Sequence, residues 1–135
     1  MRRAIRWLRS KRRDDGGVDD RLLQVFLEIA RDVDDEIHLA ARFSPPHVFA
    51  DRLMDSFTLG YLSQYMFDRL GHLAGPEIQS EHGTDVAKGT LIGLFGSAIS
   101  DEIVSEMLFR VADVRFQESA VAGAFDARSR PRCTD

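Results

Sequence analysis

At 135 residues the chain is long enough for one domain. Apolar residues make up 44% of it and charged residues 30%, a balance that supports a hydrophobic core and excludes a disordered polymer. The single cysteine, Cys133, excludes an internal disulfide, and no uncharged apolar stretch approaches the ~18 residues of a membrane span. We therefore expect a cytoplasmic protein.

The net charge of −4 conceals an uneven distribution of charge along the chain. Residues 1–13 contain seven basic side chains and no acid. Residues 14–127 contain 21 acids against 8 basic residues, a net charge of −13. Because an acidic body repels phosphate backbones, nucleic acid is excluded as a ligand unless the basic segment alone binds it.

The basic N-terminal segment, residues 1–13, has the pattern of a short amphipathic helix, with apolar residues at spacings of three and four. Such a helix can lie at the surface of an anionic membrane or dock on an acidic protein partner. A disordered cationic tail and contact with the acidic body of the same chain are the alternatives. The residues expected to bind are Arg2, Arg3, Arg6, Trp7, Arg9, Lys11, Arg12 and Arg13.

Residues 14–18 contain acids and a glycine pair and are expected to form a linker. Apolar residues at helical spacing then predict a first core helix over about residues 19–41. A second helix should begin near Pro46 and run toward Gly71 and Gly75. Glycine within a helix destabilises it by about 1 kcal/mol relative to alanine, so Gly60 indicates that another backbone passes close to it.

Residues 76–83 are mostly polar and are expected to form a connection, with or without one helical turn, followed by a third helix from Thr84. Either a separate fourth helix begins at about Ser100, or the third helix continues through this position. A fifth helix is expected over residues 118–127 and a mobile tail over residues 128–135. The apolar residues expected to be buried in these later helices include Ile103, Met107, Leu108, Phe109, Val111, Val114, Val121 and Phe125.

Small residues in the third helix are spaced to share one face. Gly89 and Gly93 are four residues apart, and Ser97 follows one turn later. Such a face allows another helix to approach closely. We expect a helix crossing inside the core, and the alternative is the seam of a homodimer.

No segment shows the sustained alternation of apolar and polar residues that a strand requires. The predicted fold is therefore all-α, a small bundle of four to five helices over residues 19–127 with a basic N-terminal arm.

Three aspartate–histidine pairs with a spacing of four residues form the pattern closest to a metal site. On a helix such pairs can point the same way and offer one oxygen and one nitrogen ligand. The chain lacks the Glu-x-x-His pairs of two-iron bundles and the His-Glu-x-x-His zinc motif, so we expect no cofactor. The pairs are Asp34 with His38, His47 with Asp51, and Asp68 with His72.

The function expected from this sequence is non-catalytic. We expect an adaptor, regulatory or accessory protein that docks through residues 1–13 on an anionic membrane surface or an acidic protein partner. One alternative is a metal-binding bundle, with or without enzymatic activity, that uses the aspartate–histidine pairs. The other is a regulator whose basic segment holds nucleic acid, with binding that weakens steeply as salt rises.

Overall fold

The computed structural model describes residues 20–42 and 54–131. These residues form five helices and no strand, which confirms the predicted all-α bundle. None of the described helices combines the length and the apolar character needed to cross a membrane. The basic segment 1–13 and Cys133 lie outside the described residues. The helices are α2 (Asp20–Arg42), α4 (Ser56–Ala74), α5 (Pro76–Phe95), α6 (Ser97–Arg110) and α7 (Val114–Ser129).

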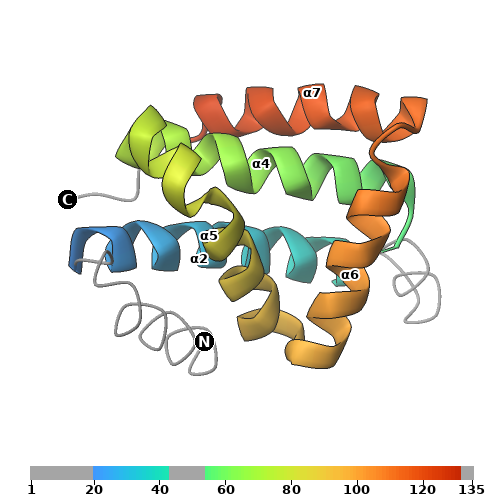
Figure 1. The fold of residues 1–135 in the computed structure, drawn as a ribbon, viewed down its shortest axis with the longest axis horizontal. Helices are drawn as coiled ribbons and strands as arrows, with labels where there is room; N and C mark the ends of the chain where they lie inside the picture. Colours follow the sequence, from blue (N-terminus) through green and yellow to red (C-terminus); the bar gives the residue numbers. More distant parts are fainter. Residues whose placement is uncertain (1–19, 43–53, 132–135) are drawn as a thin grey trace.

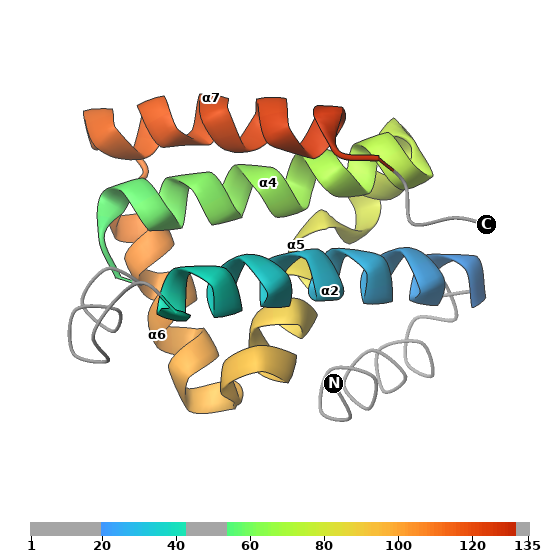
Figure 2. The ribbon, with the colours of Figure 1, turned by 180° about the vertical axis from the view of Figure 1, so that it is seen from behind.

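Three helices form a layer, and the other two pack on one side of it (Figures 1 and 2). α4 lies in the middle of the layer, between α2 and α7. α2 runs opposite to α4, whereas α7 runs parallel to it (Figure 1). α5 crosses the layer and α6 returns to the start of α7, so these two helices make the connection that a parallel pair requires.

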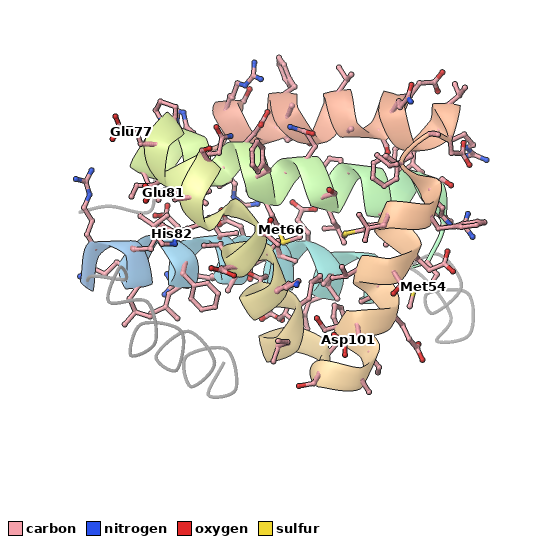
Figure 3. The ribbon with its side chains drawn as sticks, viewed as in Figure 1. Met54, Met66, Glu77, Glu81, His82 and Asp101 are labelled. Carbon is pink, nitrogen blue, oxygen red and sulfur yellow. The ribbon has the colours of Figure 1, made fainter. Side chains whose placement is uncertain are left out.

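The hydrophobic core surrounds α4. Phe26, Ile29 and Val33 recur along α2 at spacings of three and four and are fully buried against it. Met66 of α4 lies near the centre of the bundle (Figure 3) and is also buried. Each such side chain contributes about 1.5–3 kcal/mol when it is removed from water.

Two glycines with positive φ separate the helices on either side of α5. Gly75 (φ 97°) ends α4 and Gly96 (φ 85°) ends α5, and each donates its amide to the carbonyl group four residues earlier. Glycine adopts this conformation without a steric penalty. The third and fourth predicted helices are therefore separate, and the fourth begins at Ser97 rather than Ser100.

The first turns of α5 correct the prediction that residues 76–83 form a polar connection. Pro76 starts the helix, where its missing N–H is not needed. Ile78 packs against the core, and Gln79 Nε2 donates to the carbonyl oxygen of Phe67 at 3.0 Å. The polar residues of this segment lie on the exposed side of a helix, and residues 76–83 form no loop.

α4 begins later than predicted. Its first residue is Ser56, and the Asp55 carboxylate accepts a hydrogen bond from the Thr58 amide at 2.8 Å. This is a side-chain cap of the kind that starts helices. The predicted start at Pro46 lies outside the described residues.

α4 and α7 form a close crossing of two backbones. A Cβ atom on Gly60 would overlap the carbonyl oxygen of Phe116 and the hydroxyl of Ser119, and a Cβ on Gly123 would overlap the carbonyl oxygen of Tyr61. The prediction that a backbone passes close to Gly60 is confirmed.

The predicted small-residue face is divided between two helices. Gly89 is buried and Gly93 is partly buried in α5, whereas Ser97 is exposed and begins α6. The turn at Gly96 lies between them, so the three residues do not share one continuous helix. A helix crossing at Gly89 and Gly93 stays a prediction.

Candidate functional site

A buried arginine, Arg69 of α4, lies where α2, α4 and the end of α7 meet. Its Nη1 donates to the carbonyl oxygens of Ala127 (3.1 Å) and Arg130 (2.7 Å), and Nη2 donates to that of Pro131 (2.9 Å). The last carbonyl groups of a helix have no partner within the helix. The guanidinium group therefore caps the carboxyl end of α7, where a positive charge also interacts favourably with the helix dipole.

Two acidic residues of α2 balance the charge of Arg69. Asp32 Oδ2 lies 3.3 Å from Arg69 Nε, and Glu28 Oε1 lies 3.4 Å from Arg69 Nη2. Asp32 is buried, and its Oδ1 lies 3.3 Å from Nε of Arg130. Since a buried charge without a partner is destabilising by several kcal/mol, Arg69 and Asp32 depend on each other.

Two tyrosines of α4 lie beside these charges. The rings of Tyr61 and Tyr65 stack with their centroids 5.9 Å apart. Tyr65 Oη donates to Asp32 at 3.1 Å, and Tyr61 Oη donates to Asp126 at 2.6 Å. Burial and the negative charge of Asp32 raise the pKa of Tyr65 to about 12, and burial and the Asp126 hydrogen bond raise the pKa of Tyr61. Both hydroxyl groups are therefore hydrogen-bond donors at neutral pH.

The tyrosines border an open pocket of about 370 Å³ between α2, α4 and α7. Arg130 lies in its wall and pairs with Asp35 (3.9 Å) and Glu36 (3.4 Å) as well as with Asp32. The positive charge of Arg130 beside the pocket is thus paired with acidic side chains of the same chain. We name Glu28, Asp32, Tyr65, Arg69 and Arg130 the arginine cluster, and its contacts fasten the end of α7 to α2.

The arginine cluster changes what the sequence predicts for the C-terminal residues. α7 continues to Ser129 rather than ending at Ala127. Arg128 pairs with Asp68 at 3.1 Å, and the Pro131 carbonyl oxygen accepts from Arg69. The tail expected from residue 128 is therefore held by contacts as far as residue 131, and residues 132–135 lie outside the described part.

Alkaline titration tests the environment of Tyr65. In the variant Tyr61→Phe only one of the two tyrosines remains, and we expect its ultraviolet titration midpoint near pH 12, against about 10 in the unfolded chain. Because the folded state favours the protonated form, this contribution to stability is complete below pH ~10 and is lost as the pH rises to about 12. The same titration in denaturant is the control, and a folded midpoint near 10 would contradict the burial of the hydroxyl group.

Two of the three predicted aspartate–histidine pairs lie in described helices. His38 Nδ1 lies 2.8 Å from the carbonyl oxygen of Asp34 and 3.2 Å from its carboxylate, on an exposed surface of α2. His72 is exposed near the end of α4, while Asp68 accepts from Gln64 at 2.8 Å as well as from Arg128.

These pairs do not come together in the described part of the chain. No three histidine, cysteine, aspartate or glutamate side chains of residues 20–42 and 54–131 are grouped to hold a metal ion. In the first two turns of α5, Nε2 of His82 lies 3.7 Å from Oε2 of Glu81, and Glu77 lies one turn before Glu81 (Figure 3). His47 and Asp51 lie outside the described residues, so the metal-binding alternative stays a prediction.

The last turn of α6 and the residue after it expose large apolar side chains. Phe109 is 83% exposed, Leu108 73% and Val111 55%, and we name these three residues the α6–α7 corner. The prediction that they are buried is wrong, because α6 ends at Arg110 and the chain turns away from the core there. Ile103, earlier on the same helix, is buried as predicted.

Polar contacts hold the α6–α7 corner against the start of α4. Arg110 donates from Nε to Glu106 (2.8 Å) and from Nη1 to Ser56 Oγ (3.1 Å). Ser56 Oγ in turn donates to Asp113 at 2.8 Å. This hydrogen bond, together with the one from the Arg115 amide, lowers the pKa of Asp113. The apolar side chains of the corner therefore project from an ordered turn.

A second exposed apolar surface runs along α7. Val114, Val121 and Phe125 are 65%, 71% and 69% exposed, and their spacing places them on one face of the helix. We name them the α7 strip. The prediction that Val114, Val121 and Phe125 are buried is wrong, because the close crossing with α4 uses the opposite face of α7.

Comparisons of the chain with protein-family models, with curated proteins and with solved structures gave no match. The class of protein that the fold defines is an all-α bundle whose last helix is capped by a buried arginine. Its distinguishing surfaces are the α6–α7 corner and the α7 strip.

Proposed function

We propose that this chain is a non-catalytic docking protein, an adaptor or accessory subunit of the cytoplasm. It binds an anionic surface, either a membrane leaflet or an acidic protein partner, through residues 1–13 and the α6–α7 corner. The observation that carries the proposal is the exposure of Leu108 and Phe109 in the last turn of α6. Exposed apolar groups gathered in this way are typical of interaction sites.

Charge and apolar contact are expected to act together. Each basic side chain near an anionic leaflet contributes about 1 kcal/mol, and residues 1–13 carry seven of them. Burial of Leu108 and Phe109 in the interface adds about 1.5–3 kcal/mol each. α2, α5 and α6 all carry more acidic than basic residues, so the attraction to an anionic surface is expected to come from residues 1–13, and the corner is expected to add apolar contact.

Co-sedimentation of the full chain with neutral and with anionic vesicles tests this proposal. We expect binding to anionic vesicles alone. Replacing Arg2 and Arg3 with glutamine should weaken it about 30-fold, since two charges correspond to about 2 kcal/mol. Replacing Leu108 and Phe109 with serine should weaken it at least 100-fold, since two buried apolar side chains correspond to about 3 kcal/mol or more.

Matched variants control for charge and for apolar area. Arg21 and Arg31 are exposed on α2, so their replacement with glutamine removes the same charge from another surface. Ile99→Ser removes an exposed apolar side chain from the start of α6. Equal losses in test and control variants would contradict the proposal. If neither kind of vesicle binds, the membrane is excluded, and immobilised polyglutamate becomes the probe for an acidic partner.

A further inference from the structure

Three of the four large apolar side chains of α7 point away from the core, and the fourth, Phe116, is buried. Val114, Val121 and Phe125 form its outer face, whereas Ser119, Gly123 and Ala127 are among the residues that form the face against α4. A surface helix of a monomer normally turns its large apolar residues inward. For most of its large apolar residues the polarity of α7 is therefore reversed, which is the pattern expected for a helix that packs on a second partner.

We propose that the α7 strip is the contact surface of a homodimer, in which α7 of one chain packs against α7 of a second copy. α7 lies at the edge of the layer, and within the described part of the chain its extensive contact is with α4 (Figure 2). Its outer face is accessible along the whole helix. A twofold axis across the strip would place the same face of both copies together, with the order α4, α7, α7, α4.

The distribution of charge favours a second copy at α7. α2 contains six acids against three arginines, and α5 and α6 each contain three acids against one basic residue. Two copies would repel each other through these net negative helices. α7 contains Arg115 and Arg128 against Glu118 and Asp126, so its charges cancel.

The zero net charge of α7 also disfavours charged binding partners at the α7 strip. An anionic membrane surface or a strongly basic partner gains no net electrostatic attraction from a neutral helix, whereas two neutral faces can meet without repulsion. A 16-residue helix is about 24 Å long, so the interface is at the small end of stable interfaces. We therefore expect a dissociation constant in the micromolar range.

The dimer goes beyond the proposed function and does not depend on it. Its test reads molecular mass, whereas the test of the proposed function reads vesicle binding. A dimer would carry two copies of residues 1–13, and the second copy would bind at a high effective concentration once the first had bound.

Sedimentation equilibrium of the full chain under reducing conditions tests the dimer. Between about 1 and 100 µM we expect the average mass to rise from near 15.2 kDa toward twice that value. Val121→Asp and Phe125→Asp should each weaken association at least 100-fold, because each would place an unpaired charge in the interface on both copies. Both residues are exposed in the single chain, so the variants should fold, which circular dichroism checks.

Ile99→Asp is the matched control. Ile99 is an exposed apolar residue at the start of α6, and that end of α6 lies on the opposite side of the bundle from α7 (Figure 1). The control should associate as the natural chain does. A mass that stays at 15.2 kDa across the concentration range would overturn the proposal. Undiminished association of Val121→Asp and Phe125→Asp, or equal loss in all three variants, would do the same.

Discussion

Replacing Arg69 with methionine is expected to destabilise the fold by about 3–5 kcal/mol. The substitution leaves the buried Asp32 carboxylate without one of its charged partners and removes the donors to three carbonyl groups at the end of α7. Such a loss is a large part of the ~5–15 kcal/mol that stabilises a typical domain. Urea unfolding followed by circular dichroism measures it. Faster amide exchange near residue 130 should accompany it, because the end of α7 loses its contacts with α4.

Two further variants separate the arginine cluster from ordinary surface charges. Arg128→Met removes an ion pair with Asp68 in which the arginine is exposed, so a loss below about 1 kcal/mol is expected. Adding Asp32→Asn to Arg69→Met should recover part of the stability, since the unpaired buried charge is then removed. If Arg69→Met were no more harmful than Arg128→Met, the arginine cluster would not be what fastens α7 to α2.

The long periodic helices could be predicted from sequence, because burial of one face repeats at every turn. The predicted first helix, residues 19–41, differs from α2 by one residue at each end. The turns around α5 were harder to predict. Polar residues 76–83 are typical of a loop and equally of an exposed helix face, and tertiary packing of Ile78 decides between the two.

The arginine cluster left a signal in the sequence that the prediction did not use. Leu62, Met66, Arg69 and Leu73 follow one another at helical spacing, so Arg69 stands on an otherwise apolar face. Asp32 occupies a similar position next to Val33 in the first helix. A basic and an acidic residue on two buried faces predict an internal ion pair. The carbonyl groups that complete the site come from the end of α7, and no linear pattern indicates them.

The prediction of which face of α7 is buried was wrong for a different physical reason. The prediction assigned Val121 and Phe125 to the core because large apolar residues are most often buried. Small residues at 119, 123 and 127 instead allow α7 to approach the backbone of α4 at Gly60, and this contact determines which face is buried. In this helix the spacing of small residues is the better guide to burial.

A side chain at Gly60 is the most direct test of that approach. Gly60→Ala is expected to destabilise the fold by about 1–3 kcal/mol, although alanine is favoured over glycine in a helix by about 1 kcal/mol. The added Cβ overlaps a carbonyl oxygen of the α7 backbone, which cannot move without separating the helices. Gly60→Val should destabilise it further, because two more methyl groups enter the same space. Thermal and urea unfolding measure both changes.

Gly71→Ala on the same helix provides the opposite case. A Cβ there would lie 2.6 Å from Nε2 of Gln79, the far end of a flexible side chain that can move aside. We expect the free energy of unfolding to stay the same or to rise by about 1 kcal/mol. The gain will be smaller if Gln79 loses its hydrogen bond to the Phe67 carbonyl oxygen when it moves. Adding Ser119→Ala to Gly60→Ala should recover part of the loss, because it removes one of the two overlapping groups. Equal stability of Gly60→Ala and Gly71→Ala would mean that α4 and α7 lie further apart than this crossing requires, and the outward orientation of the α7 strip would lose its physical cause.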